Sequence, residues 1–418
     1  MKKIKAVLIG AGNRGITYTD IMSRMPENYE VVAVAEPIES RREHIRKKHN
    51  IPKELCFTDY KDLLKLGKIA DIAIVSTMDR QHFEPTMMAI DLKYDILLEK
   101  PIAPTKEECL EITKAAKKNN VKIVICTVLR YTPLFITLKD IIDSGKIGKV
   151  ISINHEECVG NIHQTHSFVR GNWGNSERSS FMLLQKSCHD IDILQWLIGK
   201  KCVSVQSYGS LSFFTRENAP EGAAEYCIEG CKYADTCPYN AVKLYLEENG
   251  WFRTTCTKLQ GPTDEDVKKA ISETQYGKCV FKCDNDVVDH QVVNMLFEDD
   301  ITVSFTMNPF GKGGRYIHIM GTGGEIHAAL AGDTPIKCYN YLTDEEIVIP
   351  LVGKDGIAGG HGGGDAGIVK TLYSYLNGEY NGDCIPDIEE SCYNHMIVFA
   401  AEESRLKGKT VDIDEFLK

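Results

Sequence analysis

The chain has 418 residues, of which 43% are apolar and 26% are charged. That length exceeds one ordinary hydrophobic core, and the composition is typical of a soluble globular protein with two domains. The formal net charge of −10 argues against nucleic acid or an anionic membrane as the main partner, because no basic field is present. We identify neither an export signal nor an apolar run of about 18 residues, so we expect a cytoplasmic protein without a membrane partner.

Residues 1–127 alternate short β-rich runs with helical segments. Most of these runs are continuously apolar, which is typical of strands covered on both faces of a parallel sheet. A helix should begin at Thr105, because Glu108 follows three residues later as in a capping box. These βα units predict an α/β protein with an N-terminal Rossmann domain built on a doubly wound parallel sheet. The predicted strands are Lys3–Ile9, Glu30–Ala35, Ala70–Ser76, Asp95–Glu99 and Lys122–Thr127.

The run VLIGAGNRGIT carries a GxGxxG pattern directly after the first predicted strand. Its glycines are Gly10, Gly12 and Gly15, and Asn13 and Arg14 lie between them. Such a turn makes a tight bend, admits a pyrophosphate close to the backbone, and presents the free N–H groups of a helix N-terminus. The position between a strand and a helix makes the pattern a specific one, so it predicts a dinucleotide site.

The second predicted strand ends at Glu36. An acid at this position accepts hydrogen bonds from a ribose 2′-hydroxyl and repels a 2′-phosphate, so NAD is the predicted cofactor. Arg41 and Arg42 follow closely and keep NADP open as the less favoured alternative. The next strand leads into a polar loop at its carboxyl end, where ligands bind in open α/β sheets. Its candidate cofactor-binding residues are Ser76, Thr77 and His82.

Residues 128–418 show a different pattern, with alternating strands that follow one another closely. They predict a C-terminal α+β domain with an open, largely antiparallel sheet, and its open face suggests a homo-oligomer. Thr132-Pro133 predicts a helix start. A Cys-rich insert at about 214–284, which lacks an apolar run for its own core, and a glycine-rich loop at Gly356–Gly367 interrupt the domain. The predicted strands are Val150–Glu156, Val203–Leu211, His290–Phe297, Ile301–Met307 and Tyr316–Met320.

The stretch LLQKSCHDIDILQWLIG, residues 183–199, combines a polar head with apolar residues at helical spacing, and Gly199 can end the helix. Ser187 is the predicted N-cap, with Asp190 three residues later. His189 then lies in the first turn, where the helix dipole disfavours a charged imidazole and keeps it able to accept a proton. Asp192 shares a face with His189 and can orient it.

Together GAGNRG, VSTMDRQH, EKP and HDID before an apolar helix resemble the Gfo/Idh/MocA oxidoreductases, the family of glucose–fructose oxidoreductase and inositol dehydrogenase. The resemblance runs from Val7 to about Lys370 and leaves out the Cys-rich insert. It implies NAD(P) and hydride exchange with the hydroxyl carbon of a sugar, cyclitol or glycoside. It also implies that Glu99 and Lys100 lie beside the nicotinamide, that Lys100 holds the reacting hydroxyl, and that His189 is the acid/base.

The chain departs from the family pattern four residues before the histidine, where Gln185 replaces the usual acid and Lys186 follows. Either Lys186 supplies the missing contact, or the proton relay differs, or turnover is weak. Cys188 should be a buried thiol rather than a partner of His189, because adjacent helical residues point about 100° apart. Further family-like positions predict, as a set, a polyol pocket: Arg130, Tyr131, His163, His166, Arg170, Trp173, Asp286, His290, His361 and Asp365.

The segment CIEGCKYADTCPY places Cys227, Cys231 and Cys237 close together. Three thiols need one more ligand for a tetrahedral zinc site, and we assign Cys279 as the fourth. The Cys237-Pro238 pair keeps an iron–sulfur cluster open, and thiols packed without metal are the third alternative. The predicted cofactors are therefore NAD and a structural zinc.

The sequence thus predicts an NAD-dependent oxidoreductase acting on a secondary alcohol of a sugar, glycoside or cyclitol. Lys100, His189, Asp192 and Lys186 are the predicted catalytic residues. A redox glycosidase is one alternative, in which the same oxidation acidifies a neighbouring C–H, elimination breaks the glycosidic bond, and bound NAD is recycled. A non-catalytic NAD-binding sensor is the other, and Gln185 is its main support.

Overall fold

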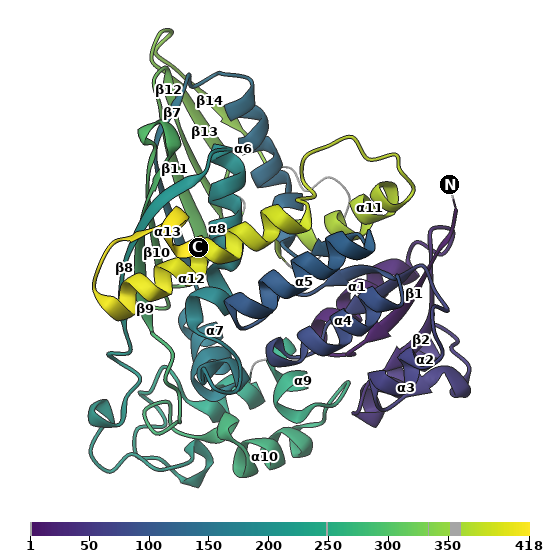
Figure 1. Cartoon of the computed structure of the whole chain (residues 1–418). Helices are drawn as coiled ribbons and strands as arrows, with labels where there is room; N and C mark the ends of the chain where they lie inside the picture. The colour runs from purple at the N-terminus through teal and green to yellow at the C-terminus, as the bar shows by residue number, and fades with distance from the viewer. Residues whose placement is uncertain (1, 248–249, 333, 352–360) are drawn as a thin grey trace.

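The computed structural model describes residues 2–247, 250–332, 334–351 and 361–418. Its strands form two sheets, and the last strand of the chain lies in the second sheet (Figure 1). No helix within the described ranges is long and apolar enough to cross a membrane. The predicted glycine-rich loop falls partly outside them, since residues 356–360 are not described.

The N-terminal sheet has six parallel strands in the order β3-β2-β1-β4-β5-β6, the order of a doubly wound dinucleotide-binding fold. It confirms the predicted Rossmann domain and adds β3, whose two residues are too few to give a sequence pattern. The strands are β1 (Ile4–Ile9), β2 (Tyr29–Ala35), β3 (Cys56–Phe57), β4 (Ile72–Val75), β5 (Asp95–Leu98) and β6 (Ile123–Ile125). The helices between them are α1 (Asn13–Ser23), α2 (Glu39–Lys48), α3 (Tyr60–Leu64), α4 (Phe83–Asp91) and α5 (Lys106–Asn119).

The second sheet has nine strands in the order β14-β13-β12-β11-β7-β10-β9-β8-β15. Its neighbouring strands pair antiparallel except β7 and β10, which are parallel, so the prediction of an open, largely antiparallel sheet is confirmed. β12 to β15 were not predicted. The strands are β7 (Val150–Cys158), β8 (Cys202–Ser210), β9 (His290–Phe297), β10 (Thr302–Asn308), β11 (Gly314–Gly321), β12 (Gly324–Leu330), β13 (Ile336–Asn340), β14 (Glu345–Ile349) and β15 (Val411–Asp412).

Helices cover one face of the nine-stranded sheet and leave the other face open. α6 (Pro133–Asp143), α8 (Met182–Ile198) and α12 (Ile388–Lys407) bury their apolar residues against the strands in the largest core cluster. On the open face Tyr208 and Tyr316 are exposed. Homo-oligomerisation through this face stays a prediction.

Two C-terminal helices pack on the N-terminal sheet, although both lie within residues 128–418, the predicted second domain. Ile388, Cys392 and Met396 of α12 join the core on the side of α5, and α11 (Gly364–Leu376) contributes to the core on the opposite face. Figure 1 shows α12 crossing from the large sheet to α5. The two sheets are therefore joined by shared helices as well as by the chain between β6 and α6.

Helix α8 begins earlier than the sequence predicts. Phe181 is its N-cap, and Ser187 lies inside the helix with a hydroxyl that has no hydrogen-bond partner. The predicted N-cap at Ser187 is therefore wrong, because the apolar residues Met182–Leu184 extend the buried stripe backwards. The predicted C-terminal end is confirmed, since Gly199 adopts a left-handed conformation with φ 65°.

The Cys-rich insert contains α9 (Trp251–Thr257) and α10 (Asp264–Glu273) and has its own apolar cluster. The expectation that it lacks a core is wrong, because its apolar residues are spread over several short segments instead of one run. The cluster includes Ala241, Tyr245, Phe252, Val267 and Ile271. The remaining short α-helices of the described chain are α7 (Asn161–His163) and α13 (Ile413–Leu417).

Candidate active site

The glycine turn between β1 and α1 has the geometry of a phosphate-binding turn. Gly10 has φ +90°, and a side chain there would meet the backbone oxygen of Ser76 at 2.7 Å. A Cβ at Gly12 would meet no protein atom within 4 Å, so the backbone at Gly12 is open to a ligand. Gly12 is also the N-cap of α1 and no side chain caps that helix, which leaves N–H groups directed toward the same space.

Glu36 lies beside this turn at the end of β2. Its carboxylate accepts hydrogen bonds from the backbone N–H groups of Ala11, at 2.7 Å, and Ile38, at 2.9 Å. Arg42 donates to the backbone oxygen of Glu36, so its guanidinium is held beside the strand end. These contacts fix an acid next to the turn, as the predicted ribose contact requires.

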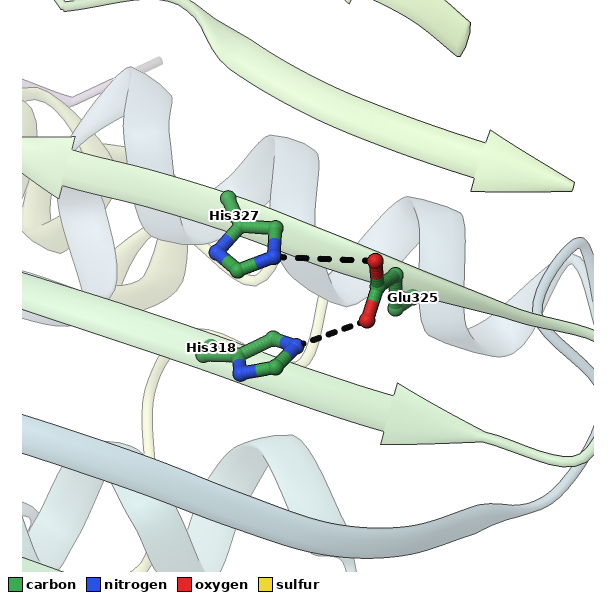
Figure 2. A group of neighbouring side chains, drawn as sticks. All are labelled: His318, Glu325 and His327. Atoms are coloured by element: carbon green, nitrogen blue, oxygen red, sulfur yellow. Dashed lines mark hydrogen bonds and ion pairs between the residues drawn. The ribbon is translucent and has the colours of Figure 1, made fainter. Parts of the chain in front are cut away.

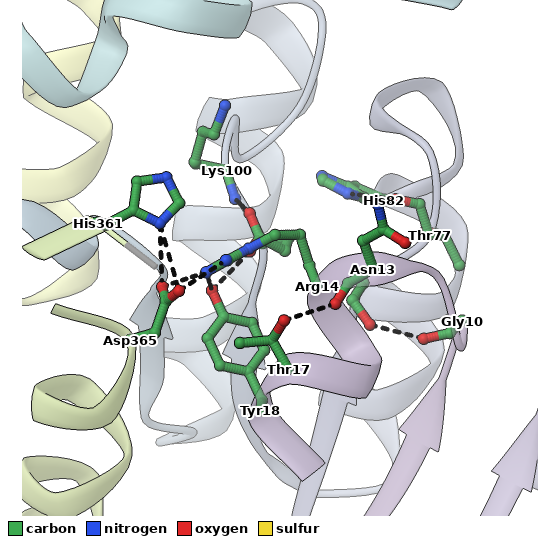
Figure 3. Close-up of polar contacts among 12 residues, drawn as sticks. Gly10, Asn13, Arg14, Thr17, Tyr18, Thr77, His82, Lys100, His361 and Asp365 are labelled. Atoms are coloured by element: carbon green, nitrogen blue, oxygen red, sulfur yellow. Dashed lines mark hydrogen bonds and ion pairs between the residues drawn. The ribbon is translucent and has the colours of Figure 1, made fainter. Parts of the chain in front are cut away.

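Three predicted cofactor residues connect loops at the carboxyl edge of the sheet. Ser76 donates to the backbone oxygen of Gly10 at 2.7 Å, and the Thr77 hydroxyl donates to Gln81 at 2.9 Å. The His82 ring lies 2.7 Å from the backbone oxygen of Pro101 and 3.2 Å from that of Thr77. Figure 3 shows Thr77 and His82 beside Asn13, across the turn from Arg14.

Arg14 connects the turn to two other segments. Its guanidinium forms ion pairs of 2.7 Å with Glu99 and 2.7 Å with Asp365 and also contacts the Tyr18 hydroxyl (Figure 3). Burial disfavours ionisation of Glu99, yet Arg14 and then Lys100 hold the pKa of that carboxyl below its ordinary value. Arg14 is thus committed to internal ion pairs that tie α1 to the start of α11.

Lys100 extends from the end of β5 to helix α8. Its backbone N–H donates to Glu99 at 2.9 Å, and its ammonium donates to the backbone oxygen of Gln185. The Lys100–Pro101 peptide bond is cis. The position with Gln185 in place of an acid therefore still contacts Lys100, but through its main chain.

His189 is a buried imidazole surrounded by four basic residues. These residues, called the cationic group below, are Lys100, Lys186, Arg315 and His361. Its ring centroid is 5.9 Å from that of His361, and its Nδ1 has no hydrogen-bond partner. Burial holds the pKa of His189 well below its ordinary value, and Lys100, His361, Arg315 and Lys186 lower the pKa further. This environment agrees with the predicted neutral imidazole. The predicted cause, the dipole at the N-terminus of the helix, is wrong, because His189 lies beyond the first turn of α8.

His361 faces His189 from the 3-10 turn His361–Gly363 that precedes α11. Its Nδ1 lies 3.2 Å from a carboxylate oxygen of Asp365, which is also paired with Arg14. The Arg14–Asp365 ion pair and the contact between Asp365 and His361 therefore connect the glycine turn to the imidazole beside His189.

Lys186 heads a second buried network that sequence reasoning missed. Its ammonium lies 3.2 Å from Glu157, and Glu157 pairs with Arg315 at 2.6 Å. Arg315 pairs in turn with Asp190 at 2.7 Å, and His155 approaches the same carboxylate at 2.9 Å. Burial holds the pKa of Lys186 below its ordinary value. The available signal was in β7, where His155 and Glu157 occupy the inward positions of an alternating strand.

Asp192 does not orient His189. Its carboxylate forms a bidentate pair with Arg130, at 2.7 and 2.9 Å, and accepts from Asn394 at 2.7 Å. Arg130 also pairs with Glu390 at 2.8 Å and is fully buried. The predicted roles of Asp192 in catalysis and Arg130 in substrate binding are therefore corrected to one internal ion pair. Tyr131 is buried in the core that α11 completes.

The remaining candidate substrate residues lie in three different places. Burial holds the pKa of His163 well below its ordinary value, and Lys186, His166 and Lys100 lower it further, so His163 is a neutral imidazole near those two lysines. His166 contacts Tyr245, Trp251 and Tyr276 of the insert.

Arg170 donates to backbone oxygens of the insert. The indole N–H of Trp173 lies 3.4 Å from the Asp79 carboxylate. The carboxylate of Asp286 accepts a hydrogen bond from the backbone N–H of Ser176. The prediction that His290 lines the polyol pocket is wrong. His290 lies on the open face of the sheet, and its side chain is 47% exposed. Cys188 is confirmed as a buried thiol, and burial raises its pKa to about 12.

The four candidate zinc ligands, Cys227, Cys231, Cys237 and Cys279, line one cavity in the insert. No three of their sulfur atoms lie within 4.8 Å of one another, since among the described residues only His318, Glu325 and His327 form such a group. Figure 2 shows those three side chains on β11 and β12, where the carboxylate of Glu325 bridges both imidazoles at 3.0 and 3.7 Å. That group lies on the open face of the sheet and outside the cationic group around His189.

Two sequence models of one oxidoreductase family match almost the whole chain. The model described as its NAD-binding Rossmann fold matches residues 4–127, and the model described as its C-terminal alpha/beta domain matches residues 139–413. The chain belongs to the Gfo/Idh/MocA oxidoreductase family. The predicted family, fold class and enzyme class are thereby confirmed.

Individual relatives are distant. YteT of Bacillus subtilis, which is named as an oxidoreductase, is 23% identical over 95% of this chain and 94% of its own. Inositol 2-dehydrogenase of Salmonella typhimurium is 26% identical over 49% of this chain and 57% of its own. Among solved structures, levoglucosan dehydrogenase in complex with NADH and levoglucosan gives a TM-score of 0.72 at 16% identity, over 99% of this chain and 100% of that one. An oxidoreductase of Agrobacterium radiobacter in complex with NAD⁺ and L-tartaric acid gives 0.69 at 13% identity, over 99% of each chain.

Proposed function

We propose that this oxidoreductase transfers hydride between NAD and a secondary alcohol carbon of a sugar, glycoside or cyclitol. The observation that carries the proposal is the buried imidazole of His189, surrounded by Lys100, Lys186 and His361 beside a dinucleotide-binding turn. A base held neutral by burial and by neighbouring cations can accept a hydroxyl proton near pH 7.

The residues at the turn fit NAD. The open backbone at Gly12 and the uncapped N-terminus of α1 would take the pyrophosphate. Glu36 would accept the ribose hydroxyls and repel a 2′-phosphate. The bound nicotinamide supplies the hydride acceptor, and the chain itself supplies the base and the cations.

Lys100, Lys186 and His361 of the cationic group each have a distinct role in this proposal. Lys100 would donate a hydrogen bond to the reacting hydroxyl and favour its loss of a proton to His189. Lys186 adds to the effect of burial that lowers the pKa of the imidazole, and it is itself positioned by Glu157. Asp365 positions His361, and Arg14 positions Asp365.

The substrate class follows from relatives and from the chemistry of the group. Inositol 2-dehydrogenase and levoglucosan dehydrogenase, to which the chain is similar, are named for a cyclitol and an anhydrosugar. Imidazole and ammonium donors also suit a ligand rich in hydroxyl groups. A sugar or cyclitol is therefore our proposed small-molecule partner, and the cytoplasm our proposed compartment.

A substrate screen tests the proposal. The purified protein is mixed with NAD and with inositols, hexoses and aryl glycosides, while NADH absorbance and aglycone release are recorded together. We expect NADH to accumulate with at least one polyol. Aglycone release without net NADH would show the redox glycosidase instead, and NAD binding without either product would support the sensor.

A further inference from the structure

Four of the six cysteines of the insert converge although they come from separate parts of it. Cys227, Cys231 and Cys237 follow one another along one loop, whereas Cys279 comes after α10. All four line the same cavity, whose wall is otherwise mostly apolar and includes the side chain of Arg170. The isolated pairing of Tyr226 with Lys278 brings the two segments together directly beside Cys227 and Cys279.

Arg170 gives the cavity a positive charge that no carboxylate neutralises among its lining residues. The residue is only 2% exposed, and its guanidinium lies 3.9 Å from the sulfur of Cys227. Two of its nitrogen atoms donate to the backbone of Lys278 and Tyr239, and the third, Nη1, is buried without a hydrogen-bond partner. A buried guanidinium with an unused donor suits an anionic group in the cavity.

Backbone N–H groups are also directed at the sulfur atoms. The backbone N–H of Tyr239 donates a hydrogen bond to the sulfur of Cys237, two residues earlier. Cys279 shows the same arrangement with the N–H of Phe281. Hydrogen bonds from a turn to the sulfurs of its own cysteines support thiolate ligands of metal centres.

We propose that Cys227, Cys231, Cys237 and Cys279 are the ligands of one thiolate-bound metal centre that holds the insert together. Four thiolates match the ligand number of a zinc ion and of an iron–sulfur cluster. Sulfurs around one zinc ion are about 3.8 Å apart, given Zn–S bonds of about 2.3 Å. No three of the four sulfurs lie within 4.8 Å of one another, which favours the cluster, whose cysteines bind different iron atoms. Arg170 would then be a charge partner of the centre.

The centre would act on the active site through the insert. The insert contacts the cofactor turn where Asn13 donates to Thr255 of α9 at 3.0 Å. It also surrounds His166 with aromatic rings, and Trp251 contacts both His166 and His163. Loss of the centre is therefore expected to loosen the insert where it contacts Asn13 and His166, without removing any residue of the cationic group.

Metal analysis tests the proposal independently of enzyme activity. The full chain, purified anaerobically without an affinity tag that binds metal, is analysed for zinc, iron and acid-labile sulfide. We expect about one centre per chain, with iron and sulfide together indicating a cluster and zinc alone indicating a single ion. Cys231→Ser should lose the metal. Cys283→Ser is the matched control, because the Cys283 thiol contacts the backbone oxygen of Cys279 at 3.4 Å but does not line the cavity, and it should keep the metal.

A second control excludes adventitious binding at the surface. The double substitution His318→Ala/His327→Ala removes the imidazoles of the open sheet face and should leave the metal content unchanged. If Cys231→Ser does not fold, a chelator applied to the wild-type protein should expose about four additional reactive thiols as the metal leaves. A metal-free wild-type chain, or a metal lost only with the two histidines, would overturn the proposal.

Discussion

Burial and then Lys100, His361, Arg315 and Lys186 lower the pKa of His189, and His163 is the other histidine of the described chain whose pKa is lowered by burial, Lys186 and Lys100 together. The motif EKP and the histidine of HDID allowed Lys100 and His189 to be predicted. The partner of Asp192 was not predictable, because helical spacing identifies residues on one face but not the side chains of other helices that pack against it. Arg130, which pairs with Asp192, comes from a different element.

We predict a pH effect for Lys186→Met. In alcohol oxidation the base must be neutral, so the rate falls as pH falls through the pKa of His189, which lies well below its ordinary value. Removing a neighbouring cation raises that pKa. The acid limb of kcat/KM against pH should therefore move to higher pH in the variant.

Lys186→Arg is the matched control, since it keeps the charge and should keep the limb in place. An unchanged limb in Lys186→Met would mean that Lys186 does not influence His189. A loss of kcat without any shift in pH profile would indicate a different role for Lys186.

At the scale of elements, the central finding is that α8 begins with Met182 and buries most of its length. The parallel strands and α5 were predictable because apolar runs and caps are local signals. The edge strand β14 was missed because its residues are nearly all exposed and give no clean alternation. β13, which lies between β14 and β12, was missed because only its first three residues alternate between buried and exposed positions. The insert core was missed because its members are dispersed along the sequence.

The start of α8 makes a testable stability prediction. An N-cap residue contributes about 1 kcal/mol, so Ser187→Ala should cost that much only if Ser187 were the cap. Because it lies inside the helix without a partner, we expect a change below about 0.5 kcal/mol in the free energy of unfolding. Asp387→Ala is the comparison, since Asp387 caps α12 by accepting from Glu390 at 2.7 Å, and it should cost about 1 kcal/mol by urea denaturation.

At the scale of the molecule, a buried ion pair joins the segment after β6 to two helices on the large sheet. Arg130 follows β6, Asp192 lies in α8 and Glu390 in α12. The sequence was sufficient to predict the family and a parallel-sheet domain followed by a largely antiparallel one. It was not sufficient to predict this junction, because the junction depends on residues far apart in the chain.

Breaking that junction should destabilise the whole protein. Asp192→Asn leaves the guanidinium of Arg130 buried with weaker compensation, so the free energy of unfolding should fall by about 3–5 kcal/mol. The double variant Asp192→Asn/Arg130→Met removes the uncompensated charge and should recover part of that loss. Denaturant melts of both variants would contradict this interpretation if the double variant were less stable than the single one.

The measurement that tests the central claim most directly compares the wild-type protein with His189→Ala in one assay. NAD affinity and the rate of NADH formation are determined together, with the best substrate of the polyol screen. We predict that the variant binds NAD as tightly as the wild type while kcat falls by about 100-fold or more, because only the base is removed. Undiminished NADH formation in His189→Ala would contradict the account, since the proton would then leave by another route.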